Sequence, residues 1–174
     1  PQIMRKLSIF ILIGFSFFGV LTAQQYHFTN YSIEHGLAQS QVEAMVQDDK
    51  GYIWFGTSIG GVSRFDGRKF SNFSSQNGLL NNQVNTFLKD SQGHIWIGTL
   101  GGLTRYDGSN FHKYALPETL KEYSVISITE DKNGNFWLGT DGAGLGRFSP
   151  KDFHKQKPAF EFFSTDNGLS DNIV

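Results

Sequence analysis

The sequence predicts an all-β fold made of repeated antiparallel units, and three observations support this. A motif G-x-x-W-x-G-T occurs at residues 51–57, 93–99 and 134–140. Its tryptophans are separated by 42 and 41 residues. The composition includes 20 Gly, 17 Phe and 6 Tyr but only 4 Pro, and aromatic residues favour strands while glycine favours tight turns. A fixed period of this length is typical of a repeat architecture.

Each unit is predicted to form four short strands. In the first unit we expect them at residues 42–47, 52–57, 62–65 and 69–73. A turn at residues 48–51 joins the first two strands. The pair Asp66 and Gly67 predicts a hairpin turn with a positive φ between the last two, and Asp107 and Gly108 repeat it.

Four antiparallel strands repeated about every 40 to 45 residues are typical of a β-propeller blade. A helical repeat would show a 3.6-residue period and fewer glycines. We therefore predict a partial β-propeller over residues 26–174, with units at 36–77, 78–121 and 122–166.

Both ends of this region extend the repeat. Residues 26–32 resemble the fourth strand of a unit, because Phe28 and Tyr31 match Phe70 and Phe73. We expect an outer strand there that completes the last blade of a ring. Residues 167–174 match 77–84 and predict the start of a fourth unit. Since propellers close with about four to eight blades, three units form part of a ring.

The first 25 residues predict a secretory signal peptide. Arg5 and Lys6 precede an apolar run over residues 7–21, and Ala23 offers a cleavage point. A transmembrane anchor, the alternative, needs about 20 apolar residues. We expect an exported protein in the periplasm or outside the cell.

The net charge and the amino-acid composition exclude some classes of function. The formal net charge is −1, without a run of Lys and Arg that would attract nucleic acid, and the chain has no cysteine for disulfide or thiol chemistry. No cofactor is expected.

The repeated letters D-x-x-G-x-[IF]-W-[FIL]-G-T, followed by glycines and R-[FY]-D-G, resemble the two-component regulator propeller repeat family. The phrase N-G-L-x-x-[NS]-x-V at 77–84 and 167–174, and loosely at 35–42, belongs to the same resemblance. The third unit departs from it, with residues 120–122 in place of Gly-Leu and Ser149 and Pro150 in place of Asp-Gly.

This resemblance implies an exported sensor propeller of about seven blades. It also implies a parent receptor anchored in the inner membrane, which carries further domains and commonly a histidine kinase. A receptor homodimer and an extracellular ligand, with a carbohydrate as one candidate, are expected on the same ground.

The three tryptophans could be platforms for stacking sugars. They occupy the same position in every unit, so we favour packing between neighbouring blades. The same structural role is assigned to the whole repeated core: Trp54, Gly56, Thr57, Trp96, Gly98, Thr99, Trp137, Gly139 and Thr140.

No catalytic residue or metal site is predicted. Asp and Gly at 48/51, 90/93 and 131/134 could suggest calcium loops, but the closing bidentate Glu is missing, so hairpin turns are favoured. The five histidines show no ligand spacing. The glycine pairs precede no helix that could hold a phosphate.

The geometry of a four-stranded meander predicts where a ligand binds. The segment leading into the first strand and the turn between the second and third strands share one side, here called the mouth face. The other two turns share the opposite side, here called the aspartate-turn face. Binding residues usually lie on loops around a concavity. On the mouth face the candidates vary between units: Gln39, Gln41, Ser58, Ile59, Asn82, Gln83, Leu100, Glu122, Tyr123 and Asp141.

The sequence thus predicts a non-catalytic, ligand-sensing propeller of a bacterial signal-transduction receptor. Two alternatives remain, because propellers host all of these functions. One is a propeller lyase or glycan-active enzyme, for which Glu122 and Asp141 are the acidic candidates on the mouth face. The other is a secreted adhesion or assembly protein. Whether the parent protein is an enzyme stays open.

Overall fold

A computed structural model describes residues 27–149 and 159–174. The chain divides into two units, Pro1–Asn30 and Tyr31–Val174. All strands of the described residues belong to the second unit, and residues 27–30 have no regular secondary structure. The predicted signal peptide lies outside the described residues. In the part of the chain described, no helix has the length and apolar character needed to cross a bilayer.

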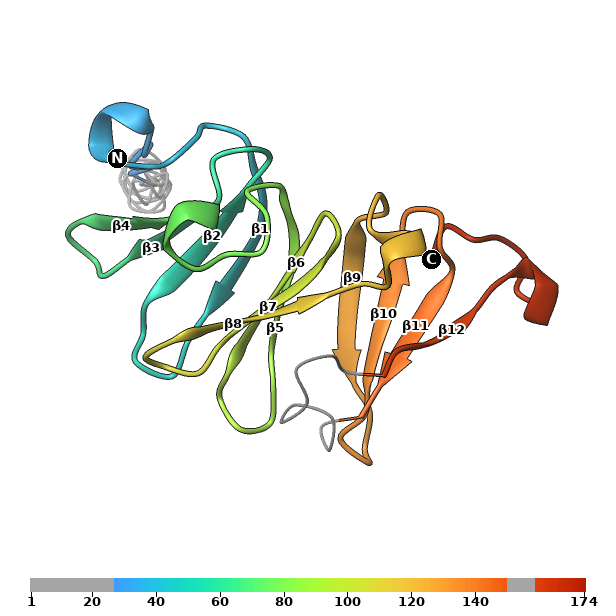
Figure 1. The fold of residues 1–174 in the computed structure, drawn as a ribbon. Coiled ribbons are helices and arrows are strands. Elements are labelled where there is room, and N and C mark those ends of the chain that lie inside the picture. Colours follow the sequence, from blue (N-terminus) through green and yellow to red (C-terminus); the bar gives the residue numbers. More distant parts are fainter. Residues whose placement is uncertain (1–26, 150–158) are drawn as a thin grey trace, which may run out of the picture. The chain divides into compact units, whose positions relative to one another are not determined.

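The described residues form three four-stranded antiparallel sheets, which follow one another along the chain (Figure 1). In each sheet the strands lie in chain order. The first sheet contains β1 (Val42–Gln47), β2 (Ile53–Thr57), β3 (Val62–Phe65) and β4 (Phe70–Phe73); the second contains β5 (Val84–Lys89), β6 (Ile95–Thr99), β7 (Gly102–Tyr106) and β8 (Phe111–Ala115); the third contains β9 (Val125–Glu130), β10 (Phe136–Thr140), β11 (Leu145–Phe148) and β12 (Glu161–Phe163). The predicted all-β fold of repeated four-stranded blades is confirmed.

The strand register repeats in every sheet. Each motif tryptophan lies opposite an arginine of the third strand, in the pairs Trp54 with Arg64, Trp96 with Arg105, and Trp137 with Arg147. The arginine side chains lie over the tryptophan rings, with the guanidinium carbon 5.4 to 5.8 Å from the ring centre. These contacts are cation–π interactions.

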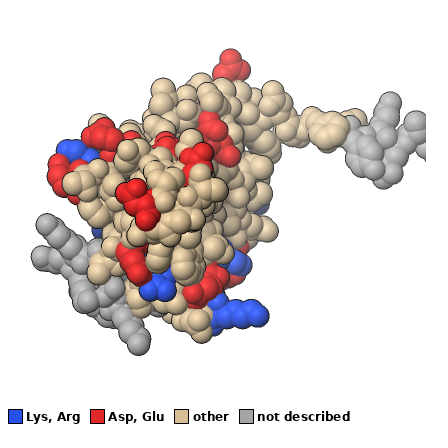
Figure 2. Space-filling view, turned by 90° about the vertical axis from the view of Figure 1, so that its right-hand side faces the viewer, with Lys and Arg blue, Asp and Glu red and all other residues tan. Residues whose placement is uncertain are grey.

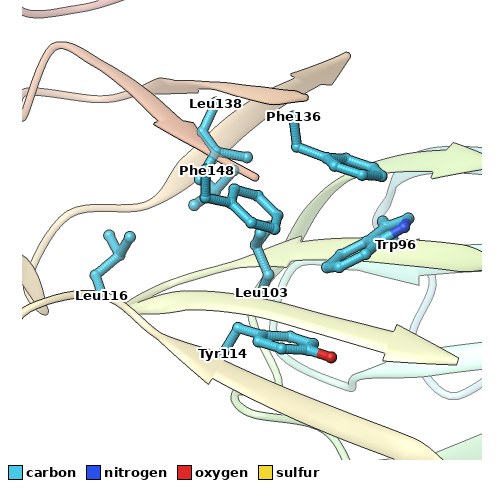
Figure 3. Close-up of a cluster of buried hydrophobic side chains, with 8 residues drawn as sticks. Trp96, Leu103, Tyr114, Leu116, Phe136, Leu138 and Phe148 are labelled. Carbon is cyan, nitrogen blue, oxygen red and sulfur yellow. The ribbon is translucent and has the colours of Figure 1, made fainter. Parts of the chain in front are cut away.

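Aromatic and aliphatic side chains fill the spaces between the blades. Between the first two sheets, Trp54 is fully buried with its ring 4.9 Å from that of Tyr106. Between the second and third sheets, Trp96 is fully buried with its ring 4.7 Å from that of Phe136 (Figure 3). Trp137 is half-buried. The core of the molecule is therefore made of two seams between blades.

The glycines of the first two W-x-G-T motifs lie in close contact with the next blade, and Gly98 also lies close to Thr86 on the first strand of its own blade. Trp and Gly two residues apart point to the same side of a strand. A Cβ atom added to Gly98 would lie 2.5 Å from Thr86 Cγ2 and 2.9 Å from the carbonyl oxygen of Val125, on β9. A Cβ on Gly56 would likewise collide with Val84 of β5. A side chain at these positions would push neighbouring blades apart.

The outer strand expected at residues 26–32 finds no pairing partner in the three sheets described. Residues 27–32 carry no strand pairing, and a short 3₁₀ turn, η1 (Ile33–His35), follows them. A strand requires a partner, and each of the three sheets already has its own fourth strand. The other end agrees better with expectation. Ile173 forms a bridge with Asp141, and the N–H of Val174 donates to the carbonyl of Thr140 across 3.0 Å.

Candidate recognition surface

The aspartate at the end of each first strand holds both its turn and the motif tryptophan. One oxygen of Asp48 accepts two backbone N–H groups, from Lys50 and Tyr52, both at 3.0 Å. The other accepts the indole N–H of Trp54 at 2.8 Å. Asp90 and Asp131 repeat this arrangement in the next blades, with indole distances of 2.8 and 3.1 Å.

The contacts at Asp90 and Asp131 lower the pKa of these two carboxyl groups. Burial raises the pKa of Asp90, but the hydrogen bonds from Trp96 and His94 outweigh it, and the pKa is lowered. The Asn135 side chain, followed by Trp137, lowers the pKa of Asp131 from 3.8 to about 2. The sequence predicted hairpin turns here, but the bond to tryptophan was not foreseen.

The turns between the third and fourth strands are longer than a two-residue hairpin, and an aspartate side chain holds them. Phe65 pairs with Phe70, so the connection contains four residues. The side chain of Asp66 accepts the N–H groups of Arg68 and Lys69, both at 2.8 Å. Gly67 has the expected positive φ, 94°. Asp107 repeats the arrangement in the second blade, where its carboxylate also lies 2.6 Å from His112 Nε2.

Backbone hydrogen bonds join the loops of the mouth face across each seam. The N–H of Gly61 donates to the carbonyl of Asn82 at 2.9 Å, and that of Gly101 to Tyr123 at 3.0 Å. Gly144 donates to Asn172 in the same way, at 2.8 Å. The second-to-third-strand turn of one blade thus contacts the segment that leads into the next blade.

Three of the candidate side chains on the mouth face hold loops in place. The amide oxygen of Gln39 accepts the N–H of Ile59 at 2.8 Å. Asn82 accepts the N–H of Ser75 at 2.7 Å, and Asp141 accepts that of Ser124 at 2.5 Å. These oxygens are already occupied, so ligand contact at these positions would compete with loop structure.

The other candidates fall into two groups. Gln41 and Ser58 lie in the first blade, where the N–H of Ser58 donates to the carbonyl of Gln41 at 3.2 Å. Gln41 is exposed, and its amide donates to Glu43 at 2.7 Å.

The second group gathers at the seam between the second and third blades. The N–H of Leu100 donates to the carbonyl of Gln83 at 3.3 Å, and Leu100 forms a bridge with Ser124. Tyr123 is half-buried, with its ring against Gly142, and Glu122 beside it is exposed. The structure therefore brings Gln83, Leu100, Tyr123 and Asp141 to one seam, while Gln39, Gln41 and Ser58 stay in the first blade.

The histidine and acidic side chains of residues 27–149 and 159–174 do not gather into a metal-binding cluster. No group of three or more His, Asp or Glu residues is placed to hold a metal within residues 27–149 and 159–174. His94 and His112 instead each contact the aspartate of a turn. On the face drawn in Figure 2, acidic and basic side chains are scattered among neutral ones.

One feature was not found from the sequence. A cavity of about 310 Å³ opens on the aspartate-turn face, with Tyr52 and Arg64 of the first blade and Tyr106 of the second in its lining. The only sequence signal for it is the arginine of the R-[FY]-D-G phrase. It lies on the side opposite to the predicted binding loops.

The blade pattern agrees with a known family. The family model described as two component regulator propeller matches residues 36–58, 78–101 and 119–142. The chain carries three two component regulator propeller repeats. Each matched propeller repeat contains the segment leading into a blade, its first strand and its W-x-G-T motif. The third repeat matches despite its departures from the pattern.

Solved structures with similar folds come from several kinds of protein. The extracellular domain of a putative hybrid two component system from B. thetaiotaomicron is 24% identical with a TM-score of 0.70, over 87% of this chain and 20% of its own. PorZ, a surface component of the type-IX secretion system of Porphyromonas gingivalis, is 20% identical with a TM-score of 0.55, over 75% and 22%. Virginiamycin B lyase from Staphylococcus aureus is 16% identical with a TM-score of 0.54, over 71% and 42%.

At these identities the likeness shows the fold alone. The repeat-bearing chain spans about a fifth of the length of the first of these structures. No curated protein sequence matches it.

Proposed function

We propose that this chain is part of an exported, non-catalytic propeller that recognises a ligand for a bacterial signal-transduction receptor. The observation that carries the proposal is the match of three segments to the two component regulator propeller family. The fold likeness to the extracellular domain of a hybrid two component system supports the same function.

The mouth face at the seam between the second and third blades is the proposed ligand-binding surface. Gln83 and Tyr123 lie there on two blades that share a buried core, so the loops that carry them are held by a rigid scaffold. Gln41 supplies an exposed amide in the first blade. A carbohydrate suits such a surface, because amide and tyrosine side chains bind sugar hydroxyls and ring faces.

The binding surface is tested by alanine substitution of Gln41, Gln83 and Tyr123 in the full receptor. Receptor output is first measured against a panel of oligosaccharides, and the affinity of an active one is then compared between variants. We expect each substitution to weaken binding while Lys132→Ala, on the opposite face, leaves the affinity unchanged. Unchanged affinity in all three variants would remove the mouth face as the binding surface.

The lyase alternative is favoured by one observation, the fold likeness to virginiamycin B lyase. It predicts that the active oligosaccharide, or another compound that binds, is cleaved on incubation with the protein. Recovery of the intact compound, together with receptor output, supports recognition. The reading frame beyond Val174 gives a second test, since a membrane span and a kinase core support a receptor and a sorting domain supports adhesion.

A further inference from the structure

The cavity on the aspartate-turn face lies between two blades that the structure describes completely. Its volume is about 310 Å³, and its lining includes Asp48, Tyr52, Arg64, Tyr106, Asp107 and Gly108. A volume near 300 Å³ is at the lower end for small-molecule sites. The cavity shares no residue with the proposed mouth-face surface, so it calls for its own explanation.

Arg64 is held in the cavity lining by aromatic rings. Its guanidinium carbon lies 4.8 Å from the ring centre of Tyr52 and 5.4 Å from those of Trp54 and Phe73. Its Nη1 donates a long hydrogen bond of 3.4 Å to the hydroxyl of Tyr106. Within the described residues, no carboxylate lies within 4.0 Å of this guanidinium. Most of its five N–H donors are therefore available to a ligand.

The repeats show why Arg64 differs from its equivalents. The residue opposite each arginine on the fourth strand is Ser71 in the first blade, His112 in the second and Glu161 in the third. In the third blade Glu161 pairs with Arg147 at 2.5 Å. Ser71 has no charge and a short side chain, so the first blade lacks this internal counter-ion.

The acidic groups in the lining are already satisfied. Asp48 accepts two backbone N–H groups and the indole of Trp54. Asp107 accepts two backbone N–H groups and contacts His112, and Asp49 pairs with Lys89 at 2.7 Å. Two cationic side chains of the lining are thus left for a ligand, the Arg64 guanidinium and the Lys50 ammonium, and both favour a hydrogen-bond acceptor with negative charge.

The second seam has different contacts at the equivalent position. There the side chain and the N–H of Ser91 both contact the Glu130 carboxylate at 2.7 Å. Phe148, which is fully buried, replaces Tyr106, and its ring stacks on Phe136. A second cavity, of about 480 Å³, is lined by Asn135 and Arg147 of the third blade, the equivalents of Tyr52 and Arg64, but there Glu161 supplies a counter-ion.

We propose that this cavity binds the carboxylate group of a small molecule no larger than about a monosaccharide, with Arg64 as the bidentate donor. The planar guanidinium matches a carboxylate with two parallel hydrogen bonds. The aromatic rings hold the guanidinium in place before binding, which reduces the entropy lost on binding. The site is separate from the mouth face and does not depend on the proposed function.

Titration of the full protein with sodium glucuronate and with glucose tests this site, because the two sugars differ in the carboxylate. Isothermal calorimetry should show saturable binding of glucuronate and at least about tenfold weaker binding of glucose. Ser71→Glu places a carboxylate where the third blade has one, so it should weaken glucuronate binding at least about tenfold, while Ser71→Gln should change it little.

Arg64→Lys keeps the charge but loses the two-pronged geometry, and intermediate weakening is expected. Thermal unfolding confirms that each variant is folded. Equal affinity for the two sugars, no saturation by glucuronate up to about 50 mM, or an unchanged affinity in folded Ser71→Glu would each overturn the proposal. Lys132→Ala, which alters neither the cavity lining nor the mouth face, should leave glucuronate binding unchanged.

Discussion

Trp96 donates its indole N–H to the carboxylate of Asp90 across 2.8 Å, and both residues are buried. The aspartate directly follows the first strand of its blade, and the tryptophan lies on the second strand and packs against the next blade. One hydrogen bond thus connects the turn, the hairpin and the seam between blades. The same pair occurs in the first and third blades.

Replacing Trp96 with phenylalanine tests this connection, since an aromatic but smaller side chain remains and the hydrogen bond to a charged acceptor is lost. We expect the free energy of unfolding to fall by about 1.5–3 kcal/mol, measured by urea denaturation of the full protein. Asp90→Ala should cost more, because the backbone N–H groups of Gln92 and His94 also lose their acceptor. Asp131→Ala, in a more exposed turn, should cost less than Asp90→Ala. If the two alanine variants lose equal stability, the burial of Asp90 does not increase the cost of removing its carboxylate.

Acid should destabilise the blades as their turn aspartates take up protons. The pKa of Asp131 is about 2, below its ordinary value of 3.8. A folded-state pKa below the unfolded one contributes stability above pH 3.8, and this contribution is lost as the pH falls towards 2. The free energy of unfolding, measured against pH, should therefore fall through this window. Asp131→Asn should make that fall less steep, whereas an unchanged slope would show that Asp131 does not contribute.

The sequence predicts the blades well because the signals for them are local and repeated. A tryptophan, a glycine and the flanking turns recur at one period, and the strands of the first unit begin and end within one residue of expectation. The outer strand expected at residues 26–32 depends on a partner blade that the segment's own sequence does not specify and that the three described sheets do not supply.

The candidate site was harder to predict, since its side chains act over long sequence separations. Gln39 and Asn82 vary between units as ligand contacts would, yet both accept backbone N–H groups from other loops. The cavity beside Arg64 depends on Tyr106, which lies 42 residues away. The sequence places the candidate residues in the mouth-face loops. Which of their side chains form hydrogen bonds with neighbouring loops depends on the folded seams between the blades.

The glycine of the W-x-G-T motif should tolerate no side chain. In Gly98→Ala the new Cβ would lie 2.5 Å from Thr86 and 2.9 Å from the backbone oxygen of Val125. Such overpacking costs about 1–3 kcal/mol, and hydrogen exchange should show faster opening of β9 against the second sheet. Gly108→Ala is the control, because its φ of 99° adds local strain but no atom lies within 4 Å of the new Cβ. If both variants speed hydrogen exchange in β9 equally, the close approach of Val125 to Gly98 is not the reason that this position requires glycine.

The region 27–174, prepared without the rest of the protein, should self-associate. The side of the first sheet away from the second blade exposes Met45 by 66% and Ile53 by 37%. Ile95 and Phe136 occupy the position of Ile53 in the second and third blades. They are 1% and 2% exposed, because a preceding blade covers them. Apolar faces and unpaired sheet edges promote association and strand exchange. Light scattering after size exclusion should therefore detect oligomers, and the double variant Met45→Lys, Ile53→Lys should shift the region towards monomer. A monodisperse, cooperatively unfolding monomer of the unmodified region would show that three blades form a stable unit without a covering neighbour.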